Sequence, residues 1–196
     1  MMKNPLRALW RPPAPRRSAT AEPTPNARPP APKLPAPRPP AQRPLTPGET
    51  ALAASVFGAA LDTRDVTVRG QAWWPLQPRN VVMAPCGHIH FHARGPFYHE
   101  DFSRAPLNLQ GLLIHELTHV WQHQSGRNVI AARHPLARYR YLPLKPGKRF
   151  EHYGIEQQAE IVRHAFLLTH GEKVEGAPPL EVYKRLLPFG PDRRVV

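Results

Sequence analysis

Cysteine, acidic residues and long apolar runs are all scarce in this chain. The single cysteine, Cys86, excludes an intrachain disulfide, which is typical of a protein kept in a reducing compartment. No stretch approaches the roughly 18 consecutive apolar residues of a membrane-spanning helix, and the charged, proline-broken N-terminus lacks the apolar core of a secretory signal. We therefore expect a cytoplasmic protein with no membrane span, exported, if at all, by a signal-independent secretion system.

Acidic residues are scarcest near the N-terminus. Residues 1–47 contain nine lysines and arginines and 15 of the 27 prolines, but only one acid, Glu22. Such a segment cannot bury enough apolar surface to offset the entropy lost on ordering. We therefore predict a disordered Pro/Arg-rich tail over residues 1–44 and a folded domain over residues 45–196. We interpret the tail as a solvated linker, while docking onto an anionic surface, a nucleic acid or a protein partner stays open.

The positive charge gives little support to nucleic-acid binding by the folded part. The formal net charge is +13, of which residues 48–196 carry only +5. These residues also lack a recognised nucleic-acid motif. Nucleic acid is therefore not an expected partner of the domain.

Turn signals and hydrophobic periodicity divide the domain into helices and short strands. Thr46, with Pro47 next and Glu49 three residues on, has the pattern of a capping box that begins a helix. The expected elements are a helix over 47–61, strands over 65–69, 80–84 and 88–92, and helices over 106–124, 155–170 and 180–187. This order predicts an α+β fold in which a small mixed sheet packs on two long helices.

The segment His-Glu-Leu-Thr-His at residues 115–119 falls within the first long helix. Residues four apart lie on one helical face, about 6 Å apart along the axis, so His115 and His119 can direct imidazole nitrogens at one metal ion. Glu116 can then reach a water bound to that ion, as in zinc hydrolases. An amphipathic helix with surface histidines is the alternative, but apolar neighbours on both sides of the motif favour a buried helix.

A catalytic zinc needs a third protein ligand and an open fourth position. The helix over 155–170 carries Glu156 and Glu160 on one face. In zinc sites with two histidines and one glutamate, the glutamate comes from a following helix, and a further acid can orient a ligating histidine through its other ring nitrogen. Glu156 as ligand and Glu160 as the outer partner fit this scheme. The reverse assignment stays open, as does a plain solvated acidic stripe.

The remaining histidines compete less well as ligands. His123 lies about 12 Å along the helix from His115, too far to share an ion. His88, His90 and His92 alternate along a predicted strand and so point to one side of it. We expect these three to line the cleft beside the metal, with direct metal binding as the alternative.

Four segments, "LTPGETALAASVFGAALD", "HIHFH", "LLIHELTHVWQHQ" and "YGIEQQAEIVRHAFLL", resemble in this order the zincin-like HExxH proteins of the bacterial Vgr-related group. The resemblance covers about residues 45–172. It implies a gluzincin-type fold with a Zn²⁺ cofactor at His115, His119 and the acidic helix. It also implies a link to type VI secretion, with a secretion-system component as a candidate partner of the N-terminal tail.

We therefore expect a zinc-dependent hydrolase, most simply a metallopeptidase acting on protein or peptide. Glu116 would activate the water and then protonate the leaving amine. Tyr153 is a candidate cleft residue that could donate to the oxyanion, and His152, Tyr139 and Tyr141 are further candidates. The alternative is a non-enzymatic zincin-like module with structural zinc that binds a protein partner, although such a closed site needs no general base such as Glu116.

Overall fold

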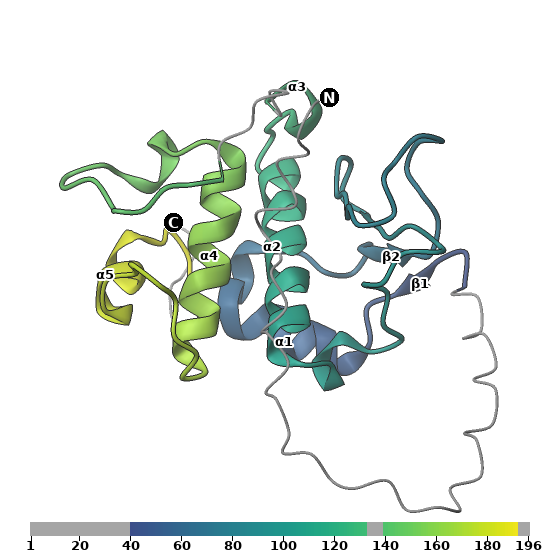
Figure 1. Ribbon diagram of the computed structural model, residues 1–196, viewed down its shortest axis with the longest axis horizontal. Helices are drawn as coiled ribbons and strands as arrows, with labels where there is room; N and C mark the ends of the chain where they lie inside the picture. The colour runs from purple at the N-terminus through teal and green to yellow at the C-terminus, as the bar shows by residue number, and fades with distance from the viewer. Residues whose placement is uncertain (1–39, 133–138, 192–196) are drawn as a thin grey trace, which may run out of the picture. The chain divides into compact units, whose positions relative to one another are not determined.

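A computed structural model describes residues 40–132 and 139–191, all within one structural unit, Pro39–Val196. Of the disordered tail predicted over residues 1–44, residues 1–39 lie outside the described residues. Within those ranges, no helix is long and apolar enough to cross a membrane. The elements, shown in Figure 1, are the strands β1 (Arg43–Pro44), β2 (Thr67–Arg69) and β3 (Ile89–His90), the helices α1 (Pro47–Phe57), α2 (Leu107–Gln124), α3 (Val129–Ala132), α4 (Ile155–Thr169) and α5 (Leu180–Leu186), and the 3-10 helices η2 (Gly58–Ala60), η3 (Phe102–Arg104) and η4 (Phe150–His152).

Helices α2 and α4 lie side by side at the centre of the described unit (Figure 1) and make its most extensive contact between elements. Both helices carry apolar residues at helical spacing, and Leu113, Leu117 and Val162 are fully buried. Burial of one leucine side chain contributes about 1.5–3 kcal/mol. Gly111 allows the close approach, because a Cβ there would lie 3.2 Å from Cδ2 of Leu167. The two helices therefore form a stable platform for the polar side chains between them.

The three strands form one small mixed sheet in the order β1-β2-β3. β1 pairs antiparallel with β2, and β2 pairs parallel with β3, so that Val68 at the centre is opposite Arg43 on one side and Ile89 on the other. β3 contacts α2. The described residues therefore form a mixed α/β unit, with the small mixed sheet that the sequence predicts.

The long helices were predicted to within a residue or two, but the strands are shorter than predicted. The strand expected over 80–84 is reduced to one antiparallel bridge between Met83 and His90. The strand expected over 88–92 keeps only the two residues that pair with β2. Ile89, His90 and Phe91 are all buried, so the expected alternation of a buried and an exposed face is absent. Between the two long helices, the described residues contain the short helices α3 and η4.

The start of the domain is fixed by a buried ion pair. Glu49, which is fully buried, accepts hydrogen bonds from the guanidinium of Arg43 at 2.7 and 2.8 Å. The backbone N–H groups of Thr46 and Phe102 also donate to this carboxylate, each at 2.9 Å. Glu49 thus completes the predicted capping box of α1 and also holds β1 and η3 in place. The folded domain therefore begins at Arg43 at the latest, before the boundary after residue 44 that the sequence suggests.

Replacing Arg43 by methionine should destabilise the domain by about 3 kcal/mol, since the buried carboxylate of Glu49 loses its only charged partner among the described residues. Urea unfolding monitored by circular dichroism measures this loss. The matched control is Arg64→Met, because the pair between Arg64 and Asp62 is exposed and should contribute little. Equal stability of the two variants would contradict an anchoring role for Arg43.

Candidate metal centre

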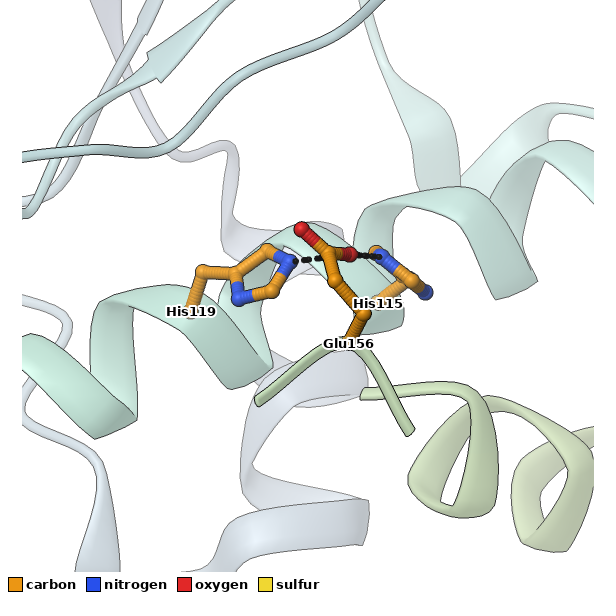
Figure 2. A group of neighbouring side chains, drawn as sticks. All are labelled: His115, His119 and Glu156. Carbon is orange, nitrogen blue, oxygen red and sulfur yellow. Dashed lines mark ion pairs between the residues drawn. The ribbon is translucent and has the colours of Figure 1, made fainter. Parts of the chain in front are cut away.

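Two histidines of α2 and one glutamate of α4 meet between the helices (Figure 2). Nε2 of His115 is 3.4 Å from Oε2 of Glu156, and Nε2 of His119 is 3.3 Å from the same oxygen. All three side chains belong to residues that are at most 5% exposed. Their ligand atoms lie within 4.8 Å of one another, and within residues 40–132 and 139–191 this is the one such group of three or more.

The spacing of these atoms is compatible with a tetrahedral zinc ion. Ligand atoms about 2.0 Å from such an ion lie about 3.3 Å from each other. The distances from Oε2 of Glu156 to the two imidazole nitrogens are 3.4 and 3.3 Å. All the ligand atoms lie within 4.8 Å of one another, so His115, His119 and Glu156 could hold the ion once their side chains adjust to it.

Glu160 lies on the outer side of His115. Nδ1 of His115 is 2.8 Å from Oε1 of Glu160, and the same carboxylate is 3.3 Å from both Arg163 and His164. A carboxylate at Nδ1 orients the imidazole ring and leaves Nε2 as the nitrogen that faces Glu156. The structure thus places Glu156 on the inner side of the cluster and Glu160 on the outer side.

Electrostatics in the cluster favour positive charge. Burial alone lowers the pKa of His115, but the contacts with Glu156 and Glu160 outweigh burial and raise that pKa to about 10. Burial also acts to raise the pKa of each carboxyl group, and the imidazoles outweigh it, chiefly His119 for Glu156 and His115 for Glu160. Both carboxyl pKa values therefore lie well below their ordinary range, and the space between the residues favours a cation.

The outer nitrogen of His119 is held by an amide instead of a carboxylate. Nδ1 of His119 is 2.8 Å from Oε1 of Gln122, and Nε2 of Gln122 donates to the carbonyl of Ile155 and to Oε1 of Gln158, each at 3.0 Å. Because the amide nitrogen of Gln122 serves these acceptors, its oxygen must accept from Nδ1–H of His119. This tautomer leaves the lone pair of His119 on Nε2, toward Glu156.

A chain of polar contacts continues from Glu160 to α5. The hydroxyl of Tyr141 lies 2.6 Å from Nδ1 of His164 and 2.6 Å from the hydroxyl of Tyr183. Burial and the hydrogen bond with Tyr183 raise the pKa of Tyr141, which keeps the phenol protonated. Through His164 and Glu160, the loop before α4 and helix α5 are connected to the outer side of His115.

Glu116 follows His115 in α2 and is also buried. It is 4% exposed, and its Oε2 atom has no hydrogen-bond partner among the described residues. Its negative charge also contributes to the raised pKa of His115. A buried carboxylate oxygen without a donor is costly, so a water or a substrate group is expected to meet it.

The three histidines of residues 88–92 do not gather at one site. Nδ1 of His88 lies 3.0 Å from the hydroxyl of Thr67, and Nδ1 of His92 accepts from the N–H of Arg94 at 3.1 Å. Burial lowers the pKa of His90 to about 4. None of the three belongs to a metal-ligating group of three within the described ranges, so the direct metal-binding alternative has no support there.

The candidate oxyanion donors differ in their surroundings. The ring of Tyr139 stacks on that of His115, with centroids 6.5 Å apart. Tyr153 is buried, and its hydroxyl has no hydrogen-bond partner among the described residues. The hydroxyl of Tyr141 is engaged in the chain to α5, and His152 is exposed. Tyr139 and Tyr153 are therefore the better placed of the four.

Sequence reasoning missed the outer partners of His119. Gln122 and Gln158 are both fully buried, although glutamine is usually exposed. The one available signal was that Gln122 follows His119 by three residues, a spacing at which helical side chains meet. No such local signal predicts Gln158, which contacts Gln122, or Tyr141 and Tyr183, which lie beyond His164 on the side of His115.

No protein-family model matches the chain. Over 134 residues it is 46% identical to the type VI secretion system spike protein VgrG2b of Pseudomonas aeruginosa. The match covers 64% of this chain and 13% of the spike protein, so the chain corresponds to a small part of that relative.

A solved structure of one domain of this relative matches the chain over most of the domain's length. The effector domain of Pseudomonas aeruginosa VgrG2b is 40% identical, and the match covers 65% of this chain and 75% of that domain with a TM-score of 0.56. The sequence comparison and the structure comparison therefore identify the same relative. The chain belongs to the family of the VgrG2b effector domain.

Proposed function

We propose that this chain is a zincin-like, zinc-dependent hydrolase, most simply a metallopeptidase acting on protein or peptide. The observation that carries the proposal is the meeting of His115, His119 and Glu156 in a buried cluster, with Glu116 beside it. The similarity to the VgrG2b effector domain supports a role in type VI secretion. We infer that the protein is exported by that route, with residues 1–39 of the N-terminal tail, which lie outside the described residues, as a docking segment.

The buried charges fit a divalent cation. Three buried glutamates, Glu116, Glu156 and Glu160, surround the site, and Arg163 contributes one positive charge at 3.3 Å from Glu160. A divalent cation between His115, His119 and Glu156 would add positive charge where three acids are buried, and buried charges are tolerated when they are compensated. This electrostatic fit supports a metal at the site.

The side chains can divide the chemistry of amide hydrolysis between them. Zinc at His115, His119 and Glu156 would supply a Lewis acid that polarises the scissile carbonyl and acidifies a water. Glu116 takes the proton from the attacking water through its unpartnered oxygen and passes it to the leaving amine. Tyr139 or Tyr153 can donate a hydrogen bond to the developing oxyanion. A module with structural zinc would not need the buried, unpartnered carboxylate of Glu116.

The two acids of α4 should behave differently when each is changed to glutamine. Glu156→Gln should lose stoichiometric zinc, because an amide oxygen is a poor zinc ligand. Glu160→Gln should keep the metal but bind it about 10- to 100-fold more weakly, since Nδ1 of His115 retains an acceptor without charge. Zinc content after dialysis and competition against a chelator measure both effects.

Glu181→Gln, in an exposed pair with Lys184, is the control for these two variants and should behave as the unchanged protein. Full zinc retention in Glu156→Gln combined with loss in Glu160→Gln would transfer the ligand role to Glu160.

Glu116→Gln should keep zinc and the fold but abolish peptide hydrolysis, because the amide cannot accept the proton of water. Hydrolysis of an unbiased peptide pool, followed by mass spectrometry, tests the activity, and zinc content tests the site. Glu151→Gln, an exposed change in η4, is the control. If the zinc-loaded unchanged protein cleaves no peptide or protein, the module with structural zinc is the better account.

A further inference from the structure

A cavity next to the metal centre is lined mostly by residues that have no part in the chemistry described above. The cavity has a volume of about 850 Å³, opens beside Glu156 and is lined by the segment 140–148, by Tyr153 and by the first residues of α4. Its size exceeds what one or two waters need and is typical of cavities that bind small ligands or parts of peptides. Because Glu156 belongs to both, the cavity adjoins the metal cluster.

The charged side chains that line this cavity are mostly positive. Three cationic side chains line it, those of Arg140, Lys145 and Lys148, and the single acid in the lining is Glu156. The Glu156 carboxylate lies against the two histidines of α2. Within residues 40–132 and 139–191, none of the three cations forms an ion pair with an acid, so their charge is available to a ligand.

A buried hydroxyl and the N-terminal end of a helix also favour an anionic ligand in the cavity. Tyr153 is 4% exposed, yet its hydroxyl has no hydrogen-bond partner among the described residues. Nζ of Lys148 lies over the ring of Tyr153 in a cation–π contact, 4.1 Å from the ring centroid. A buried hydroxyl without a partner is costly unless a ligand supplies one. Gly154, Ile155 and Glu156 at the N-terminal end of α4 also line the cavity, where the helix dipole attracts negative charge.

We propose that this cavity is a subsite for a carboxylate of the substrate, so that peptides with an acidic side chain near the scissile bond are preferred. The inference rests on the proposed hydrolase function, because it treats the cavity as part of the same binding cleft. Arg140, Lys145 and Lys148 supply the charge that attracts the carboxylate, and the hydroxyl of Tyr153 supplies a donor, which leaves Tyr139 as the donor to the oxyanion. A carboxylate seated there lies next to the residues that would hold zinc.

Binding can be measured without turnover by using the full chain as the zinc-loaded Glu116→Gln variant. The probes are two pools of short, C-terminally amidated peptides with a neutral fluorophore, identical except that glutamate in one pool is replaced by glutamine in the other. We expect the glutamate pool to bind about tenfold more tightly by fluorescence anisotropy. The difference should shrink as salt is raised, because exposed charges are screened.

Variants locate the effect in the cavity. Arg140→Met and Lys148→Met should each reduce the preference for the glutamate pool several-fold, and Tyr153→Phe should weaken binding of that pool without changing any charge. The matched control is Lys173→Met, an exposed lysine outside the cavity lining, which should leave the preference unchanged. Equal binding of the two pools, or an equal loss with Lys173→Met, would overturn the subsite.

The subsite and the hydrolase can fail separately. If the unchanged protein cleaves both pools equally well, the hydrolase stands and the carboxylate subsite is wrong. If it cleaves neither pool, but the glutamate pool still binds preferentially through Lys148, the subsite stands and the hydrolase is wrong. Tighter binding of a phosphoserine pool than of the glutamate pool would assign the cavity to phosphate and overturn the carboxylate proposal.

Discussion

The carboxylate of Glu156 lies within 3.4 Å of one nitrogen on each of two histidines, and the arrangement of the described unit depends on this contact. It joins α2 to α4 through the buried polar side chains of His115, His119 and Glu156. The apolar contact between the helices supplies stability, and the polar contact lies within the same interface. Both histidines come from α2, and α4 supplies the third side chain of the cluster.

Such a buried polar group is tolerated only if its outer atoms also find partners. The two histidines solve this differently: a carboxylate, Glu160, lies against His115, whereas an amide, Gln122, lies against His119. The charged partner raises the pKa of His115, and the amide fixes the tautomer of His119. The outer contacts reach the loop before α4 and α5, so elements distant in sequence orient the same few ring nitrogens.

The sequence revealed those features that depend on local spacing. The capping box at Thr46 and the helical periodicity located α1, α2 and α4, and the interval of four residues placed His115 and His119 on one face. It could not distinguish the inner from the outer acid of α4, since both share a face and only the approach of α2 separates them. Glu49 was recognised as a helix cap but not as the partner of Arg43, because that ion pair and the contacts of Gln158 depend on the fold. The strands were overestimated because their length depends on the partner strand that the fold supplies: residues 88–92 alternate in the sequence, but only Ile89 and His90 pair in the sheet.

X-ray absorption spectroscopy of the purified full chain tests the central claim most directly, because it reports the metal and its ligands together. The account predicts about one zinc per chain, bound by two imidazole nitrogens and a carboxylate oxygen at about 2.0–2.1 Å, with a further light atom from solvent. A protein that takes up no zinc would contradict it. So would a zinc bound by sulfur at about 2.3 Å, since the one cysteine, Cys86, is exposed and is not part of the cluster of His115, His119 and Glu156.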